Sequence, residues 1–246
     1  WIWGLPITSD NVTNLMNFQA HIGNEESWGY GHQVGRAIDK EFYTKIDNKD
    51  FRKHSWLDPG LFDYYEYKSC RPDYKEFFDP NSAASTKLPG SLVAIKFRPG
   101  QGNYTTYTVG NAVDHPLMRV EEMYLIEAEA TAHYDATTGK SLLQSFMANR
   151  DPAYTVPAAN DLIDEIIFQK RIEFWGEGVI FYDLKRLNIG MHNGDTGTNA
   201  PPMAQLSTDG RAPWWNCVFP LNAVQQNKAL AGKNNPNPTQ TVKSVK

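Results

Sequence analysis

Aromatic rings set among polar and glycine-rich segments are the side chains of the first half with the most evident chemistry. No periodic stripe of apolar residues directs these rings into a core. The C–H face of a pyranose packs on an indole or phenol ring, while its hydroxyls need polar partners beside it. The rings we select are Trp28, Tyr30, Trp56 and Tyr65, with Asn24 and Asp58 as the polar partners. We expect this segment to suit sugar binding; the competing interpretation for any single ring is packing under a loop.

A second group of candidate residues is a set of acids around a Gly-Glu-Gly turn, Glu173, Glu177 and Asp183. A glycosidase needs two carboxylates about 5 to 10 Å apart, and the sequence does not show which of its 28 acids could meet. Cations lie one or two helical turns away, so we interpret the acids as partners of an ion-pair network. The residues we assign to structure are Glu127, Glu129, Arg171, Glu173, Glu177, Asp183 and Arg186.

Motifs for nucleotides, metals and hydrolysis are incomplete. Residues 138–141 end like a phosphate-binding loop, but position 134, which should be glycine, is Tyr134. The six histidines are scattered, and no Gly-x-Ser-x-Gly segment occurs. No cofactor is required, while a calcium ion in an acidic loop and a disulfide between Cys70 and Cys217 stay open.

Composition excludes several classes of protein. The chain has 246 residues, a net charge of −4 and a pI near 5.9, which argues against nucleic acid as a partner. Apolar runs are far shorter than the roughly 20 residues that span a bilayer. Aromatic residues make up 13%, beside 18 Gly and 15 Pro, so we expect long ordered loops that carry rings.

The elements that must position these side chains change character near residue 115. Residues 1–115 contain closely spaced breakers, which predict irregular loops with a strand over 91–98 that pairs with 104–109. After Pro116 an apolar stripe predicts a helix that ends near Gly139. A second helix is predicted over residues 141–149, and a third begins at a cap, Asn160 or Asp161, and ends at Gly176. Two shorter helical segments are predicted over 179–187 and around 223–228.

Small side chains predict how these helices pack. Ala128, Ala130 and Ala132 allow a neighbouring helix to approach closely. Antiparallel helices joined by short connections are the unit of tetratricopeptide-like stacks. We therefore predict a mainly α fold of tetratricopeptide-like helical hairpins with long loop excursions and minor β structure.

Four segments in order resemble the SusD/RagB family, the surface glycan-binding lipoproteins of Bacteroidetes nutrient uptake. Residues 116–130 resemble its Arg-x-x-Glu-x-Tyr-Leu-x-x-Ala-Glu-Ala helix, and residues 141–150 resemble the helix that follows. Residues 171–186 resemble its Glu-Gly and Asp-Leu-x-Arg signature, and residues 219–221 resemble its closing Phe-Pro segment.

The resemblance implies an organisation in two parts. Residues 1–115 are the loop-rich excursion that carries the candidate ligand face, and residues 116–246 are the helical C-terminal region of the family with a surface tail. Family members are about twice this length. The resemblance thus implies that the N-terminal half, which carries the lipidated cysteine, is absent from this chain.

The function that the resemblance implies is non-enzymatic. A SusD-like protein binds oligosaccharide at the outer-membrane surface and delivers it to a SusC-like TonB-dependent transporter, with the membrane reached only through a lipid anchor. A tetratricopeptide-like scaffold that binds protein rather than sugar is the first alternative, and a glycoside hydrolase is the second.

Overall fold

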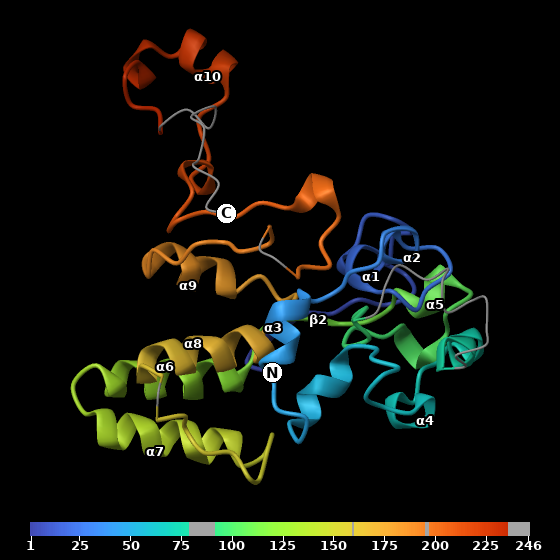
Figure 1. The fold of residues 1–246 in the computed structure, drawn as a ribbon. Helices are drawn as coiled ribbons and strands as arrows, with labels where there is room; N and C mark the ends of the chain where they lie inside the picture. Colours follow the sequence, from blue (N-terminus) through green and yellow to red (C-terminus); the bar gives the residue numbers. More distant parts are fainter. Residues whose placement is uncertain (79–91, 159, 195–196, 236–246) are drawn as a thin grey trace. The chain divides into compact units, whose positions relative to one another are not determined.

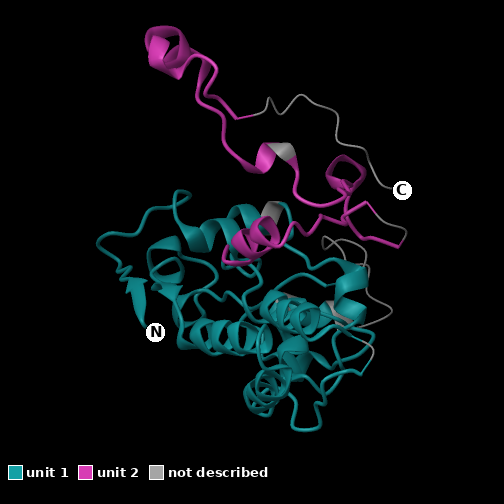
Figure 2. Ribbon diagram, turned by 90° about the vertical axis from the view of Figure 1, so that its left-hand side faces the viewer, with its two compact units in different colours: residues 1–177 teal, residues 178–246 magenta. Residues whose placement is uncertain are grey.

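The protein is mainly helical, as predicted, and its chain forms two compact units (Figure 2). The computed structural model describes residues 1–78, 92–158, 160–194 and 197–235. The first unit comprises residues Trp1–Glu177, and the second comprises Gly178–Lys246. The predicted division near residue 115 lies inside the first unit and stays a prediction.

Three helices form the regular part of the first unit. They are α6 (Val120–Ala132), α7 (Ala136–Met147) and α8 (Leu162–Glu173), and Figure 1 draws α6 between the other two. Asp135 caps α7 and Asp161 caps α8, each by accepting hydrogen bonds from backbone N–H groups of the first turn. The short connection between α6 and α7 makes them the predicted antiparallel hairpin.

The predicted boundaries of α6 and α7 are wrong. Pro116 does not begin a helix but lies in strand β2 (His115–Met118), which pairs antiparallel with β1 (Trp3–Leu5). Proline fits this two-stranded sheet because both strands are edges and its missing N–H costs no ladder bond on the outer side. Gly139 does not end the first helix; it lies buried within α7, against the backbone of Ala132.

The buried face of α6 also differs from the predicted stripe. Ala128 and Thr131 are buried as expected, but Val120, Tyr124 and Tyr134 are exposed. Leu125, with no exposed surface, takes the central position instead. The cause is that α6 packs between two helices, so its buried surface is set by α7 and α8 together rather than by one apolar stripe.

Short helices and turns make up the rest of the first unit. Glycines and prolines recur too often for longer elements, and Asp or Asn side chains cap several of the short ones. These elements are α1 (Phe18–Ile22), α2 (Tyr30–Gln33), α3 (Lys40–Thr44), η1 (Phe51–Ser55), α4 (Tyr64–Tyr67), η2 (Pro72–Phe78), η4 (Gly100–Gly102) and α5 (Tyr107–Gly110).

The apolar segment from Leu92 to Ile95 forms the centre of this unit. It does not pair with 104–109, as predicted, because residues 107–110 form helix α5. It bridges Ala37 and Trp56 instead, and all four of its side chains are buried. Ser91, the first residue of the predicted strand, lies outside the described residues.

The second unit has little regular structure. Its elements are α9 (Ile180–Arg186), η5 (Pro202–Ala204), η6 (Pro213–Trp215), α10 (Leu221–Gln226) and η7 (Lys228–Leu230). Helix α9 matches the predicted segment, and the Phe181 ring contacts Trp215 with 5.4 Å between centroids. Cys70 of the first unit and Cys217 of the second are free thiols.

In the described part of the chain, no helix combines the length and the apolar character needed to cross a lipid bilayer.

Candidate ligand-binding site

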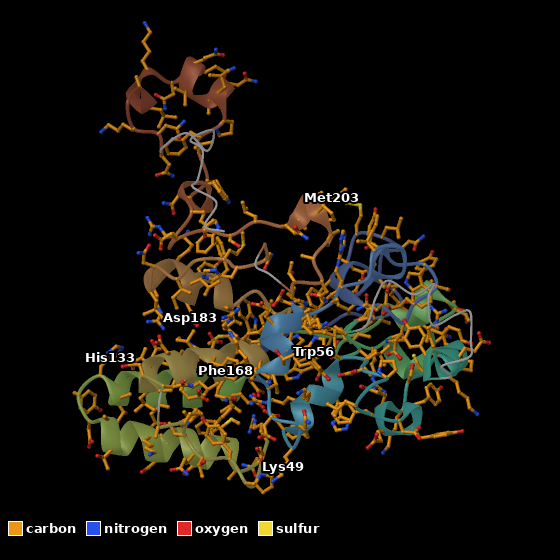
Figure 3. The ribbon with its side chains drawn as sticks, viewed as in Figure 1. Lys49, Trp56, His133, Phe168, Asp183 and Met203 are labelled. Atoms are coloured by element: carbon orange, nitrogen blue, oxygen red, sulfur yellow. The ribbon has the colours of Figure 1, made fainter. Side chains whose placement is uncertain are left out.

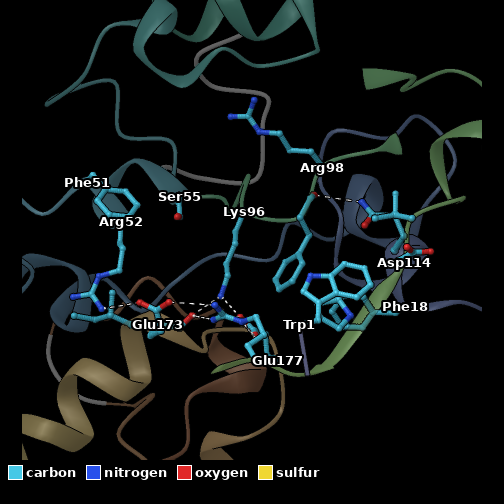
Figure 4. Close-up of a pocket in the computed structure, with 16 residues that line it drawn as sticks. Trp1, Phe18, Phe51, Arg52, Ser55, Lys96, Arg98, Asp114, Glu173 and Glu177 are labelled. Carbon is cyan, nitrogen blue, oxygen red and sulfur yellow. Dashed lines mark hydrogen bonds and ion pairs between the residues drawn. The ribbon is translucent and has the colours of Figure 1, made fainter. Parts of the chain in front are cut away.

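A cavity of about 500 Å³ in the first unit combines aromatic rings with charged and polar side chains (Figure 4). Figure 4 shows Trp1 and Phe18 on one side of the cavity and Phe51 on the other, with Lys96 between them. Phe97 completes the set of rings. Ligand sites are commonly of this size and combine apolar walls with a few polar groups.

Separate elements hold the rings in place. Phe18 begins α1, where Asn17 caps the helix, and its ring makes an edge contact with Phe97 at 5.1 Å between centroids. Phe51 begins η1, capped by Asp50. Trp1 is positioned by the strand pair, in which the Ile2 N–H donates to the Met118 carbonyl at 2.9 Å. Trp1 and Phe51 keep 68% and 58% of their surface exposed, so both rings are open to a ligand.

One carboxylate at the wall of this cavity, that of Glu173, forms ion pairs with three guanidinium groups. Arg52 Nη1 lies 3.2 Å from Glu173 Oε2, Arg119 Nη1 lies 3.3 Å from Oε1, and Arg150 Nε lies 3.3 Å from Oε2. The three arginines come from segments far apart in the sequence. The predicted ion-pair network therefore exists, but the partners of Glu173 are distant arginines rather than its neighbours on the helix.

Glu177 forms the second half of this network. Arg119 donates to both of its carboxylate oxygens, at 2.9 and 3.0 Å, and Lys96 Nζ donates to Oε1 at 2.6 Å. Lys96 also donates to the carbonyls of Glu173 and Trp175. The lysine and arginine thus hold the end of α8 and the turn that follows it.

Electrostatics in this network keep Glu173 ionised. Burial alone would raise the pKa of Glu173, but the guanidinium groups of Arg150, Arg52 and Arg119 outweigh it and lower the pKa below its ordinary value. Burial lowers the pKa of Lys96, and Glu177 opposes that effect. A general acid of a glycosidase needs a raised pKa, so this arrangement suits a structural network better than catalysis.

Two polar groups on the cavity wall are left for a ligand. Ser55 is half-buried, and its hydroxyl makes no hydrogen bond with any residue that the structure describes. Asp114 accepts the Ile7 N–H at 2.9 Å through Oδ1 and leaves Oδ2 without a partner among the described residues. A hydroxyl and a carboxylate oxygen next to exposed rings match the hydrogen-bonding needs of a sugar.

Two of the residues predicted to contact a ligand lie in the interior, and for these the prediction is wrong. Trp56 has no exposed surface and packs between the Tyr43 and Trp175 rings. Asn24 is 2% exposed and satisfies backbone groups, accepting the Arg36 N–H at 2.7 Å and donating to the Ala94 carbonyl at 2.6 Å. Both are used by the core around residues 92–95.

The other four predicted residues are at least partly exposed, and their contact with a ligand stays a prediction. Tyr65 is 66% exposed, and Tyr30 is 39% exposed and stacks on His21. Trp28 is half-buried and donates to Asn111 Oδ1 at 3.0 Å. Asp58 is half-buried and accepts the Gly60 N–H at 3.1 Å. None of the six residues lines the 500 Å³ cavity.

The rings that do line the cavity were not selected from the sequence. Phe97 lies in the segment predicted as a strand, and Arg119 lies in the motif at 116–130, but the sequence assigns neither residue to a ligand site. Nothing local distinguishes Trp1, Phe18 or Phe51 from the other rings of the first half. The cavity draws its lining from positions between 1 and 177, a grouping that only the folded chain creates.

Comparison with known proteins gives a consistent family assignment. A model of the SusD family matches residues 32–235. A crystal structure of a SusD-like carbohydrate binding protein from Bacteroides vulgatus superposes with a TM-score of 0.50 and 23% sequence identity. The superposition covers 77% of this chain and only 35% of that protein, and it supports the fold alone. No curated protein matches the chain.

Proposed function

The chain belongs to the SusD family, and on that premise we propose that its first unit binds a glycan in the cavity lined by Trp1, Phe18, Phe51 and Phe97. The observation that carries the proposal is the combination of exposed rings with the Ser55 hydroxyl and the second carboxylate oxygen of Asp114, around 500 Å³ of space. The rings would pack on sugar faces, and the polar groups would bind hydroxyls.

The proposed role is capture without hydrolysis. In support of it, Glu173 and Glu177 are ion-paired, and the lowered pKa of Glu173 makes this carboxyl a poor proton donor. An open site that depends on stacking and hydroxyl hydrogen bonds gives weak affinity, on the order of micromolar to millimolar. Weak binding is useful where the glycan must be released again.

The proposed destination of the glycan is a SusC-like TonB-dependent transporter at the outer-membrane surface. Support for this step comes from membership of the family. Exposed Tyr30 and Tyr65 would add contacts for a longer oligosaccharide, as the sequence predicts.

The proposal is tested by affinity gel electrophoresis of the purified chain against a panel of polysaccharides. We expect the double substitution Trp1→Ala and Phe51→Ala to reduce retention at least tenfold on any glycan that retards the wild type. The melting temperature should stay the same, because both rings are more than half exposed.

The matched control is Tyr134→Ala, an 81% exposed ring that does not line the cavity, and it should bind like the wild type. If Tyr30→Ala with Tyr65→Ala removes retention while the Trp1 and Phe51 variant keeps it, binding lies at the predicted rings and not in the cavity. Release of reducing sugar by the wild-type chain would favour the hydrolase.

A protein-interaction scaffold is the second candidate, supported by the outer face of α6. Val120 and Tyr124 lie one helical turn apart on this face and are 43% and 54% exposed, which is unusual for large apolar side chains. If the chain binds none of the glycans, this face becomes the leading candidate for function, and Tyr124→Lys should then abolish binding to the transporter.

A further inference from the structure

A second cavity in the first unit, of about 640 Å³, has a different chemical character. It lies among residues 45–50, residues 147–157 and helix α8, and its wall is half polar. Figure 3 labels Lys49 and Phe168, which come from two of these segments. Neither the rings of the first cavity nor the predicted site residues contribute to it.

Hydrogen bonds to Glu165 fix the wall of this cavity. Tyr154 donates its hydroxyl to Oε1 at 2.7 Å, Gln169 donates to the same oxygen at 2.8 Å, and Asn160 donates to Oε2 at 2.8 Å. Burial and the neighbouring Glu165 raise the pKa of Tyr154, which keeps its hydroxyl protonated as the donor. The loop after α7 is thus tied to α8, and the cavity is held open without a ligand.

Asp151 is a buried carboxylate on the wall of this cavity, and one of its two oxygens has no hydrogen-bond partner among the described residues. The residue is 3% exposed, and its Oδ1 accepts the Ala153 N–H at 2.9 Å. No other hydrogen bond and no ion pair reaches its carboxylate from the described part of the chain. A buried carboxylate without a cation is costly, so an ammonium group is the partner that this position favours.

The remaining charges of the wall agree with a cationic ligand. Asp47 and Asp164 also line the cavity, while Asp50 is neutralised by Arg52 at 2.6 Å. Like these two acids, Lys45 and Lys49 are exposed, so solvent screens all four charges, and buried Asp151 is the charge that acts most strongly on a ligand. Beside the acids, Ile46, Met147 and Phe168 offer an apolar surface for the body of the ligand.

We propose that this cavity is a second binding site, which takes a small ligand with a protonated amine on a hydroxylated ring, an amino sugar, with its ammonium on Asp151. The choice of a sugar as the body of the ligand rests on the proposed function. The choice of the amine rests on Asp151 and its surroundings alone.

Isothermal titration calorimetry of the purified chain tests the proposal with three probes: a glucosamine trisaccharide, its fully N-acetylated counterpart, and spermidine. We expect the glucosamine trisaccharide to bind at least tenfold more tightly than the N-acetylated one, because acetylation removes the charge. Equal affinity for the two trisaccharides, or binding of spermidine alone, would overturn the proposal.

The variant that isolates the charge is Asp151→Asn, since the amide oxygen can still accept the Ala153 N–H. We expect it to lose at least tenfold in affinity for the glucosamine trisaccharide, while Asp10→Asn, an exposed acid away from the cavity, changes nothing. Unchanged affinity of Asp151→Asn refutes the assignment. If that variant does not fold, the double variant Asp47→Asn and Asp164→Asn is the substitute, since both side chains are exposed. Its affinity for the glucosamine trisaccharide must then be at least threefold lower than that of the wild type.

The second site and the proposed function can be rejected by different results. The Trp1→Ala and Phe51→Ala variant should bind the glucosamine trisaccharide like the wild type, since neither ring lines the second cavity. Loss of this ligand in that variant would place it in the first cavity and so reject the second site, while leaving the proposed function intact.

Discussion

Burial separates the predicted residues into two groups, those in the core and those open to solvent. Trp56 and Tyr65 both lie in loop segments without apolar periodicity, so the sequence does not distinguish them. In the structure Trp56 has no exposed surface, whereas Tyr65 is 66% exposed. The difference comes from a bridge between Trp56 and Ala94, a contact over some forty residues. Residue type therefore predicts the chemistry that is present but not which rings offer it.

Glu26 is the individual residue with the most unusual environment. It has no exposed surface, its carboxylate lies over Gly23, and Gln19 donates to Oε1 while Oε2 has no partner among the described residues. Burial raises its pKa to about 7, with Gln19 opposing and Glu25 adding to the shift. Two consecutive acids in a glycine-rich segment suggest a solvated loop, so the sequence did not reveal this burial.

We predict that Glu26 makes stability fall as the pH rises. The unfolded chain loses this proton near the ordinary value of 4.5, and the folded chain loses it at about 7. Between those values the folded state holds the extra proton, so its stabilising effect is complete below pH 4.5 and lost as the pH rises through 7. The difference amounts to roughly 3 kcal/mol.

Urea unfolding at pH 5 and pH 8 measures the effect. Glu26→Gln should remove most of the loss of stability between the two pH values, whereas Glu76→Gln, an exposed acid, should keep it. A pH dependence that is the same in the wild type and in Glu26→Gln would show that Glu26 does not carry it.

Helices with strong terminal signals are the elements that the sequence predicts best. The cap at Asp161, the acids of the first turn and the glycine at 176 place α8 where the structure has it. Pro116 misled the prediction of α6, because proline suits the first turn of a helix and an edge strand equally. The choice between them is made by Trp3–Leu5, more than a hundred residues away.

Gly139 sets the distance between α6 and α7, and we predict that Gly139→Ala destabilises the protein. A Cβ there would lie 2.7 Å from Cα and Cβ of Ala132, so the helices must move apart. Overpacking costs about 1–3 kcal/mol. That outweighs the gain of up to about 1 kcal/mol in helix propensity, because the clash is with backbone.

The prediction is tested by measuring the melting temperatures of Gly139→Ala and of a control variant, Ser145→Ala, which changes an exposed position on the same helix. The first variant should melt lower than the wild type, and the second should melt within a degree or two of it. A rise in melting temperature for Gly139→Ala would mean that propensity decides and that the helices tolerate the extra methyl group.

For the molecule as a whole, Glu173 is the point where separate parts of the first unit are joined. Arg52, Arg119 and Arg150 each pair with this one carboxylate, and each is at least four-fifths buried in its side chain. Neither the identity nor the distance of these partners follows from the sequence, because helical spacing suggests Lys170 and Arg171 instead. Lys170 pairs with Glu129, and Arg171 lies over the Phe42 ring.

We predict that Glu173→Gln costs about 3–5 kcal/mol of folding free energy, since it removes the charge that compensates buried cations. Urea unfolding measures this loss, and Glu127→Gln on the exposed face of α6 should stay within about 0.5 kcal/mol of the wild type. A loss for Glu173→Gln as small as that of the control would show that the arginines find other partners.

The position of Glu173 along the chain has a consequence for how the protein is made. All three arginines leave the ribosome before their shared carboxylate, Arg52 by 121 residues. Until α8 is complete, Arg52 has only Asp50 and Arg119 has only Glu121 as an acidic partner from the segments already made, and Arg150 lacks its carboxylate. We therefore expect the segments that carry these arginines to come together only after α8 has been synthesised.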